Sequence, residues 1–525
     1  MNSITPKILI VMPNNLGDVL MTTAALRGLR KKFPSGFLAF LVDKTCAEVI
    51  ETNPDLNQVF VFDRKQVRRD LEDPSCWQQG IQHIESTIGD IRQLQFELII
   101  NFAQEKYGVY LSHLLEGKSY RGLHLTEQGD QMINDPWTNY LFSIPFARRY
   151  AACLVPEIFC LIAGIKPSPA KLFIQLTTQD SEFADEFIKS ADLPAAPELI
   201  AIQAGAAWPS KCWHESNFAL LADELSRRGK TVIFLGAPQE TGRIKTIQKS
   251  MQTKAICAAG KTTLRQSAAI LSRCQKLITG DTAAMHIAAA LEIPTLALFV
   301  PTNPLETGPY GAGHIVLQPK NCSTCFDPHC PHALKCQASI SVELVLNVIT
   351  HWGTTSYSSP EVNVYKTVNN LQGKIVYENL NPLWQKEFDR QNTISQSLFA
   401  IFSQNFSELA LLKQSALKTI KAPLTALIRI SEEIVDLYRT MIKCVQPSSP
   451  DQSQLSKTSQ QIGKLEKSMD NLGEELQLLI SANRIHINSL NPNKNISLML
   501  NEHVMVYRTF LEKLKNLQKN LAILE

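Results

Sequence analysis

The feature that most constrains this chain is a unit of three parts that recurs along it: a short apolar run, a polar turn and a helical pattern. Residues 7–12 form such a run, and a Gly-containing turn and apolar residues at helical spacing from about Val19 to Leu29 follow it. Residues 37–42 and 98–102 begin similar units, and each run is long enough for a buried parallel strand. The first part of the chain is therefore predicted to be a doubly wound α/β domain.

A second series of apolar runs follows, which predicts a second α/β domain. The runs lie at residues 199–203, 231–235, 276–279 and 295–299. The segment 163–197 between the two series is rich in Pro and small residues, as is typical of a linker or hinge. We therefore expect an N-terminal domain at residues 1–170 and a second domain at residues 171–352.

The composition changes beyond His351, first to a polar segment and then to a tail with few Gly. We expect a linker at residues 353–385 and a helical extension at residues 386–525. Apolar residues step by three and four along one part of this tail, as in a heptad seam. They are Ile462, Leu465, Met469, Leu472, Leu476 and Leu479. This pattern predicts a helical bundle or a coiled coil, and it leaves open whether the helices pack on their own chain or join copies of it.

The length and charge of the chain exclude several classes of protein. A chain of 525 residues exceeds one ordinary domain. Lys and Arg number 52 against 49 Asp and Glu, a net charge of +3, so general binding to nucleic acid is not expected. The first residues lack the pattern of a signal peptide, and no stretch is apolar for long enough to span a membrane. We expect a cytoplasmic protein whose scattered cysteines are reduced.

The first turn carries a candidate catalytic residue, Asp18. It follows Gly17 at the start of the first predicted helix, outside the carboxyl end of the first strand, where α/β sheets bind their ligands. A carboxylate there could act as a general base, although an aspartate in a first helical turn is also an ordinary partner of the helix dipole. The turn has no GxGxxG fingerprint, which argues against a dinucleotide-dependent oxidoreductase.

A second turn, at Gly280-Asp281-Thr282-Ala283, leads from a strand into a helix of small residues that contains His286. Unpaired amides at the start of this helix could hold a phosphate. The alternative is that Asp281 or Thr282 only caps the helix and His286 only packs. Lys211, which follows the strand at 199–203, could neutralise a diphosphate or be an ordinary surface lysine.

Four of the twelve cysteines gather in one short segment, with the spacing C-x2-C-x4-C-x5-C. They are Cys322, Cys325, Cys330 and Cys336. Four thiolates at this spacing could hold a structural zinc or iron ion. Free thiols and a reversible disulfide are the alternatives, because the second CxxC of a ribbon-type zinc site is missing.

Over about residues 7–350 the order of these motifs resembles glycosyltransferase family 9, the lipopolysaccharide heptosyltransferases. The resemblance rests on LGDVLMTTAALRGLRKKFP near the N-terminus and on GDTAAMHIAAALEIPTLALFVPTNPLETGPYG at residues 280–311. It implies a GT-B fold, in which two Rossmann-like domains face a cleft, the first binding the acceptor and the second a nucleotide sugar. Such enzymes invert the anomeric centre without an essential metal.

The resemblance also implies roles for particular residues. Asp18 looks like the general base, and Lys211 looks like the partner of the diphosphate. Glu240 resembles a ribose ligand, although it could merely stabilise a first helical turn. The residues that resemble the donor loop are Gly280, Asp281, Thr282, Ala283 and His286, with the amides of residues 282–284 facing the departing diphosphate.

The basic residues of the first domain meet anionic core sugars and phosphates in this family. The basic run here consists of Arg64, Lys65, Arg68 and Arg69. It could contact an acidic acceptor, or it could simply be a solvated face.

The expected function is transfer of a heptose or related sugar from an ADP-activated donor to a lipopolysaccharide core or related saccharide. Peripheral association with the inner membrane and oligomerisation through the C-terminal helices are the partner interactions that we expect. A noncatalytic sugar-nucleotide-binding scaffold and a GT-B nucleotide-sugar epimerase are the alternative functions.

Overall fold

The structure is a computed structural model of the chain. It describes all residues except 1–4, 14, 147, 168–170, 192–197, 331–333, 354–355, 372, 390, 393–394, 397–413, 446–451, 473–475, 478–479, 482, 485–495 and 524–525. The chain forms two compact units. The first consists of Met1–Ala103, Leu114–Tyr120 and Leu154–Gln385, and the second of Gln104–His113, Arg121–Cys153 and Lys386–Glu525.

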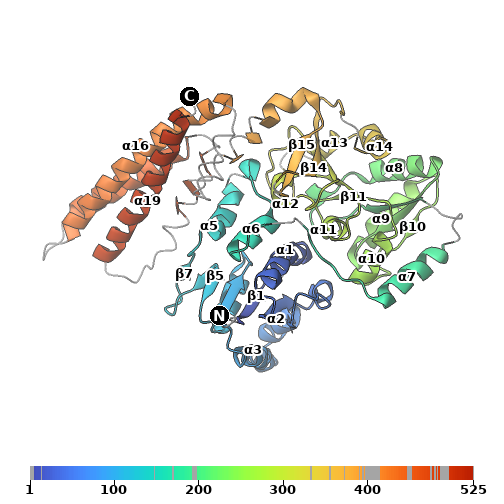
Figure 1. Cartoon of the computed structure of the whole chain (residues 1–525), viewed down its shortest axis with the longest axis horizontal. Coiled ribbons are helices and arrows are strands. Elements are labelled where there is room, and N and C mark those ends of the chain that lie inside the picture. The colour runs from blue at the N-terminus through green and yellow to red at the C-terminus, as the bar shows by residue number, and fades with distance from the viewer. Residues whose placement is uncertain are drawn as a thin grey trace. The chain divides into compact units, whose positions relative to one another are not determined.

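Two α/β domains make up most of the first unit, and each is built on its own sheet (Figure 1). The sheet of the first domain has the order β3-β2-β1-β4-β5. Its strands are β1 (Lys7–Val11), β2 (Phe37–Asp43), β3 (Gln58–Phe62), β4 (Leu98–Asn101) and β5 (Tyr120–Gly122). β1 pairs in parallel with both β2 and β4. Their successive residues are buried, so both faces of the sheet are covered and the strands read as unbroken apolar runs.

Helices connect the first four of these strands, and one more helix follows the sheet. They are α1 (Leu16–Lys32), η1 (Ala47–Val49), α2 (Arg64–Glu72), α3 (Trp77–Arg92) and α6 (Val155–Ile162). α1 starts directly after β1 and packs against α6. Its basic last turn of Arg30, Lys31 and Lys32 suits the negative end of the helix dipole.

The second domain is built on an eight-stranded sheet in the order β10-β9-β8-β11-β12-β13-β14-β15. Its strands are β8 (Glu198–Gln203), β9 (Lys230–Leu235), β10 (Ile256–Cys257), β11 (Lys276–Gly280), β12 (Thr295–Leu298), β13 (Ile315–Pro319), β14 (Val362–Asn369) and β15 (Ile375–Asn379). The first six are parallel, and β14 and β15 add an antiparallel hairpin at one edge.

The structure has this hairpin at a place where the sequence predicts a linker, residues 353–385. β14 pairs with β13 from Val362 to Lys366, and its residues Val362 and Val364 join the core of the second domain. Buried residues alternate with less buried ones over residues 362–364 and again over residues 365–368, as they do in a strand. Residues 362–379 are thus part of the second sheet.

Helices cover the second sheet and connect its strands. They are α7 (Thr178–Lys189), η4 (Pro209–Lys211), α8 (Glu215–Arg227), η5 (Pro238–Glu240), α9 (Thr241–Ser250), α10 (Leu264–Leu271), α11 (Ala283–Ala290), α12 (Pro304–Thr307), α13 (Lys335–Ala338), α14 (Val342–Thr350) and η6 (Pro382–Trp384). α7 lies inside the predicted linker 163–197, because Thr177 and Asp180 form a capping box that starts a helix there. α7 packs against α10.

The second unit combines the C-terminal helices with an insertion from the N-terminal half. Its elements are α4 (Lys106–Leu114), β6 (His124–Leu125), β7 (Gln131–Met132), α5 (Pro136–Ser143), η2 (Ile144–Phe146), η3 (Arg148–Tyr150), α16 (Gln414–Val445), α17 (Gln452–Met469) and α19 (Ile496–Ile523). An ion pair joins the insertion to the tail, with Arg149 Nη2 3.3 Å from Glu387 Oε1. Residues 121–153, which we expected in the N-terminal domain 1–170, therefore cluster with the tail.

The tail is helical, as the sequence predicts, and its long helices pack on one another. α16 packs against both α17 and α19, as Figure 1 shows for α16 and α19. The predicted heptad seam does not lie on one helix, because α17 ends at Met469 and a turn follows at residues 470–472. Ile462, Met469 and Leu476 are nevertheless buried, and Leu479 lies outside the described residues. The buried residues of the seam thus lie among the packed helices of the tail, and oligomerisation through these helices stays a prediction.

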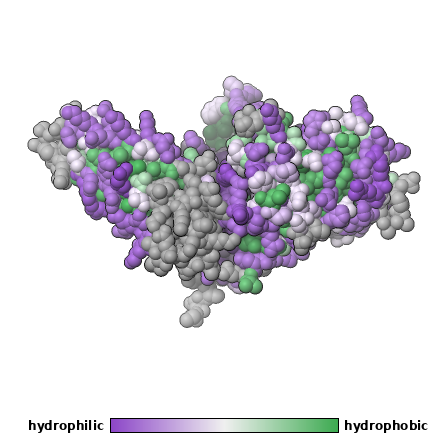
Figure 2. Space-filling view, turned by 90° about the horizontal axis from the view of Figure 1, so that it is seen from above, coloured by the Kyte–Doolittle hydropathy of each residue, from purple (hydrophilic) through white to green (hydrophobic). Residues whose placement is uncertain are grey.

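None of the described helices combines the length and the hydropathy that crossing a membrane requires. On the face that Figure 2 shows, hydrophobic residues appear in separate groups among hydrophilic ones.

Candidate functional site

Asp18 lies in the first turn of α1, the helix that follows the carboxyl end of β1. Its side chain is half-buried. The turn before it is tight, and Asn15 takes a positive φ of 61° at the N-cap position. The structure therefore places Asp18 at the edge of the first sheet where α/β domains bind ligands.

The surroundings of Asp18 are both acidic and basic. Burial raises the pKa of the Cys46 thiol, and the nearby carboxylates of Asp43 and Asp18 raise it further. Arg64 opposes them, and its Nε lies 3.7 Å from Oδ2 of the buried Asp43. Arg64 thus brings a positive charge into the neighbourhood of Asp18.

The first turn of α1 touches the helix that carries His286. A Cβ atom added at Gly17 would lie only 3.1 Å from Cδ2 and 3.5 Å from Nε2 of His286. A side chain at position 17 would therefore crowd the imidazole, and glycine allows the two helices to approach. α1 and α11 pack on each other, so the residue next to Asp18 is in contact with the predicted donor loop of the second domain.

Lys211 and Asp281 form a buried ion pair at the carboxyl end of the second sheet. Lys211 Nζ lies 2.8 Å from Asp281 Oδ2, and the two side chains are 16% and 7% exposed. Gly280 permits this arrangement, because a Cβ atom there would lie 2.8 Å from the carbonyl oxygen of Lys211. The sequence predicts both residues as donor ligands, and the structure brings them together.

Three side chains that we did not predict complete the surroundings of this pair. Lys211 Nζ lies 4.8 Å from the ring centroid of Trp208 and 5.9 Å from that of Phe326, and Thr307 Oγ1 donates to Asp281 Oδ2 at 3.4 Å. Trp208 stands three positions before Lys211, and Thr307 lies within the motif at residues 280–311, so proximity in sequence was the available signal. Aromatic faces attract the ammonium group and shield it from water.

The start of α11 is suited to bind an anion. Thr282 occupies the N-cap position, yet its side chain does not cap the helix and instead lies 2.8 Å from Thr279 Oγ1. The helix proper begins at Ala283, and the amide of Met285 already bonds to the carbonyl oxygen of Thr282. The amides of Ala283 and Ala284 therefore remain for a ligand, and the methyl side chains leave room for its approach.

His286 is buried on α11, beside both charges of the ion pair. Burial lowers the pKa of its imidazole to about 4, although Asp281 opposes the shift. Its Nδ1 atom has no hydrogen-bond partner among the residues that the structure describes. The ring is therefore neutral at physiological pH, and a bound ligand could supply the missing partner.

This burial predicts a loss of stability in mild acid. An unfolded His286 binds a proton near pH 6.5, whereas the folded ring stays neutral down to about pH 4, so the unfolded state binds more protons between these values. From pH 7 to pH 5 we expect the free energy of unfolding to fall by about 2 kcal/mol on account of this residue. Urea unfolding at both pH values measures this fall. In His286→Gln the fall should be smaller by about this amount, and in the control His351→Gln, at an exposed histidine, it should equal that of the wild type. Equal pH slopes for the wild type and His286→Gln would contradict the assignment.

Glu240, at the end of η5, lies against the start of the loop that leads from β8 to Lys211. Its carboxylate accepts hydrogen bonds from Gln203 Nε2 at 2.9 and 3.1 Å and from the amide of Ala237 at 2.7 Å. A Cβ atom at Gly205 would collide with Oε1 at 2.0 Å, so the carboxylate lies against the loop backbone. The structure places Glu240 on the same edge of the sheet as Lys211, and its ribose contact stays a prediction.

The residues of the predicted basic run lie on α2, and they differ in their exposure and in their partners. Arg64 points toward Asp43, as described above, whereas Arg68 and Arg69 are exposed. Arg68 Nε lies 2.8 Å from Glu72 Oε1, and Arg69 donates to Gln66 at 2.7 Å. Lys65 is also exposed. Arg64 and Asp18 both act on the Cys46 thiol, and an acceptor contact by any of the four stays a prediction.

Of the four cysteines of the predicted metal site, Cys336 lies in α13 and the other three precede that helix. Burial raises the pKa of Cys322 to about 12, and Cys336, which hydrogen-bonds to it, adds to the shift. Cys330 and Cys336 are buried and Cys325 is exposed. Among the described residues, which exclude His332, no three His, Cys, Asp or Glu side chains are arranged to hold a metal ion. A structural zinc or iron here stays a prediction.

Comparison with known proteins identifies the family. Residues 157–335 match the model of glycosyltransferase family 9 (heptosyltransferase). This region is therefore similar to glycosyltransferase family 9. Lipopolysaccharide heptosyltransferase 2 of Salmonella typhimurium is 24% identical over 322 residues, which cover 58% of this chain and 85% of that protein.

Solved structures of family 9 and of a heptosyltransferase share the fold. The crystal structure of a family 9 glycosyltransferase from Veillonella parvula matches with a TM-score of 0.56 and 26% identity, over 67% of this chain and 98% of that one. The ADP-heptose lps heptosyltransferase II of E. coli matches with a TM-score of 0.50 and 17% identity, over 66% and 97% of the two chains. The two α/β domains thus form a GT-B fold, and the helical tail is an addition to it.

Proposed function

We propose that this chain is an inverting glycosyltransferase that moves a heptose or related sugar from an ADP-activated donor to a lipopolysaccharide core or related saccharide acceptor. The observation that carries the proposal is the contact between Gly17 and His286, which sets Asp18 of the first domain beside the loop of Asp281 and Lys211 in the second. A general base and a diphosphate-binding loop are the two halves of such a site. The name of the Salmonella relative supports heptose and lipopolysaccharide as substrate classes.

In the proposed mechanism the second domain holds the nucleotide diphosphate. Lys211 turns from Asp281 toward the diphosphate and neutralises it as a point charge. The amides of Ala283 and Ala284 at the start of α11 donate to the same phosphates. As the sugar–phosphate bond breaks, negative charge grows on the leaving oxygen, and these groups stabilise it.

Asp18 completes the reaction from the first domain. Its carboxylate takes the proton from the acceptor hydroxyl while that oxygen bonds to the anomeric carbon on the face opposite the diphosphate. The new glycosidic bond forms as the carbon–oxygen bond to the phosphate breaks, so the configuration inverts and ADP leaves. Arg64, near Asp43 and Asp18, is the basic residue best placed to meet an anionic group of the acceptor.

The proposed substrates also suggest where the enzyme works. We expect the enzyme to work in the cytoplasm, where a lipid-linked acceptor would hold it at the cytoplasmic face of the inner membrane. The described helices offer no membrane span, so such an association would be peripheral.

Binding of nucleotides tests the donor assignment. Calorimetric titration of the chain with ADP, GDP and UDP should give the tightest binding with ADP. The ADP-sugar alone should be bound and left unconverted, because a transferase needs its acceptor, whereas an epimerase would convert it. Preference for another nucleotide, or no binding of any, would overturn the donor assignment.

A further inference from the structure

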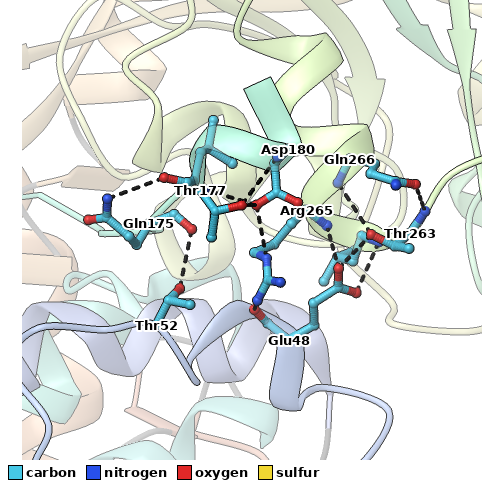
Figure 3. Close-up of polar contacts among 10 residues, drawn as sticks. Glu48, Thr52, Gln175, Thr177, Asp180, Thr263, Arg265 and Gln266 are labelled. Atoms are coloured by element: carbon cyan, nitrogen blue, oxygen red, sulfur yellow. Dashed lines mark hydrogen bonds and ion pairs between the residues drawn. The ribbon is translucent and has the colours of Figure 1, made fainter. Parts of the chain in front are cut away.

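A glutamate of the first domain caps a helix of the second. The carboxylate of Glu48, in η1, accepts hydrogen bonds from the amide of Leu264 at 3.1 Å, the amide of Arg265 at 3.2 Å and the hydroxyl of Thr263 at 2.5 Å. These three residues form the start of α10. Figure 3 shows the carboxylate reaching from η1 to the start of this helix.

Arg265 adds further hydrogen bonds to this contact. Its Nη1 donates to the carbonyl oxygen of Glu48 at 3.3 Å, and its Nε donates to Asp180 Oδ2 at 3.1 Å (Figure 3). Asp180 belongs to the capping box of α7, which follows the connection between the two domains. A further bond across the domains joins Thr52 Oγ1 to the carbonyl oxygen of Gln175 at 3.3 Å. The guanidinium thus ties η1 to two helices of the second domain.

α10 does not need Glu48 in order to be capped. Thr263 and Gln266 already form a complete capping box, in which each side chain accepts from the other's amide. The box leaves the amides of Leu264 and Arg265, and Glu48 takes both. The carboxylate therefore serves the contact between domains, and the negative charge suits the positive end of the helix dipole.

The contact lies in a closed ring of packed elements that contains the candidate site. η1 packs on α1, which carries Asp18, and on α10. α10 packs on α11, which carries His286, and α11 packs back on α1. Since each of these four elements packs on the next around the ring, a change at the contact between η1 and α10 would alter how α1 packs on α11.

We propose that Glu48 is a positioning residue for the transfer reaction: by capping α10 from the first domain, it fixes the helix of Asp18 against the donor helix α11. This inference rests on the proposed function. The groups that hold the nucleotide, Lys211 and the start of α11, lie within the second domain and do not need Glu48. Glu48 should therefore affect the chemical step and leave nucleotide binding unchanged.

The test uses Glu48→Gln in the full chain, with Glu51→Gln as the matched control. Glu51 lies on the exposed surface three positions away in the same segment. The glutamine loses the charge and one accepting oxygen, so hydrogen exchange of the Leu264 and Arg265 amides should speed up about tenfold. We expect kcat to fall at least about tenfold, because a misplacement of 1 Å can cost about a hundredfold. The ADP dissociation constant should change less than about twofold, and Glu51→Gln should match the wild type.

Other outcomes would overturn the inference. Unchanged exchange at Leu264 and Arg265 would show that the cap does not form in solution. Faster exchange with an unchanged kcat would show that the cap does not position Asp18, and a parallel loss of ADP binding and melting temperature would reduce Glu48 to a structural role. If the wild type transfers no sugar while Glu48→Gln still speeds up the exchange, the proposed function fails and the cap between the domains stands.

Discussion

Replacing Asp18 by asparagine should lower kcat for sugar transfer by about 10²- to 10⁴-fold, the range that general-base catalysis contributes. Asparagine keeps the shape of the side chain in the first turn of α1 and cannot accept the proton of the acceptor hydroxyl. Binding of ADP should stay within about twofold of the wild type, because Lys211 and the start of α11 are intact. Initial rates at saturating donor, together with calorimetry, measure both quantities.

Asp90→Asn is the matched control for this substitution. Asp90 is an exposed aspartate on α3 in the same domain, and its replacement should leave the rate and the binding unchanged. A transfer rate of Asp18→Asn close to that of the wild type would show that another group takes the proton. Loss of ADP binding in Asp18→Asn would show that Asp18 acts on the donor.

The second large effect is expected for Lys211→Met, which should weaken both donor binding and folding. The ammonium group is the proposed partner of the diphosphate, so affinity for ADP should fall about 10- to 100-fold. Its removal also leaves the charge of Asp281 buried without its ion-pair partner, since that side chain is only 7% exposed. Breaking a buried pair from one side costs about 3–5 kcal/mol of stability. Calorimetry and urea unfolding measure the two losses.

A double variant separates the two roles of Lys211. In Lys211→Met/Asp281→Asn the buried charge is gone, so most of the stability should return, whereas the affinity for ADP should stay low. Lys230→Met serves as the control, because the pair of Lys230 with Glu198 is 31% and 40% exposed and should contribute less than about 1 kcal/mol. If the double variant is as unstable as Lys211→Met, the cost lies in lost packing against Trp208 and Phe326, contrary to this prediction.

Much of the fold follows from local patterns in the sequence. The apolar runs at 7–12 and 276–279 predict strands that the structure has, because parallel strands buried on both faces need unbroken apolar residues. The hairpin at residues 362–379 was missed, since its alternating polar residues resemble those of a linker. α7 was missed for a similar reason, because the small and Pro residues around it hide the capping box at Thr177.

Some residues of the candidate site can likewise be predicted from the local sequence, and others cannot. Asp18, Lys211 and Asp281 each follow a strand at its carboxyl end, and the parallel sheets collect such residues at one edge. Trp208 could have been suggested by its proximity to Lys211 in sequence. The contact of Glu48 with α10 spans more than two hundred residues and depends on how the two domains meet, so no local pattern indicates it.

Transfer of sugar from ADP-heptose to a heptose-deficient lipopolysaccharide acceptor tests the central proposal most directly. Purified chain, donor and acceptor should give one glycosylated product with inverted anomeric configuration and one ADP for each sugar transferred, and neither should form without the acceptor. Conversion of the donor in the absence of acceptor would instead indicate an epimerase. Tight binding of ADP-heptose with no turnover on any saccharide acceptor would contradict the proposal and indicate a binding protein.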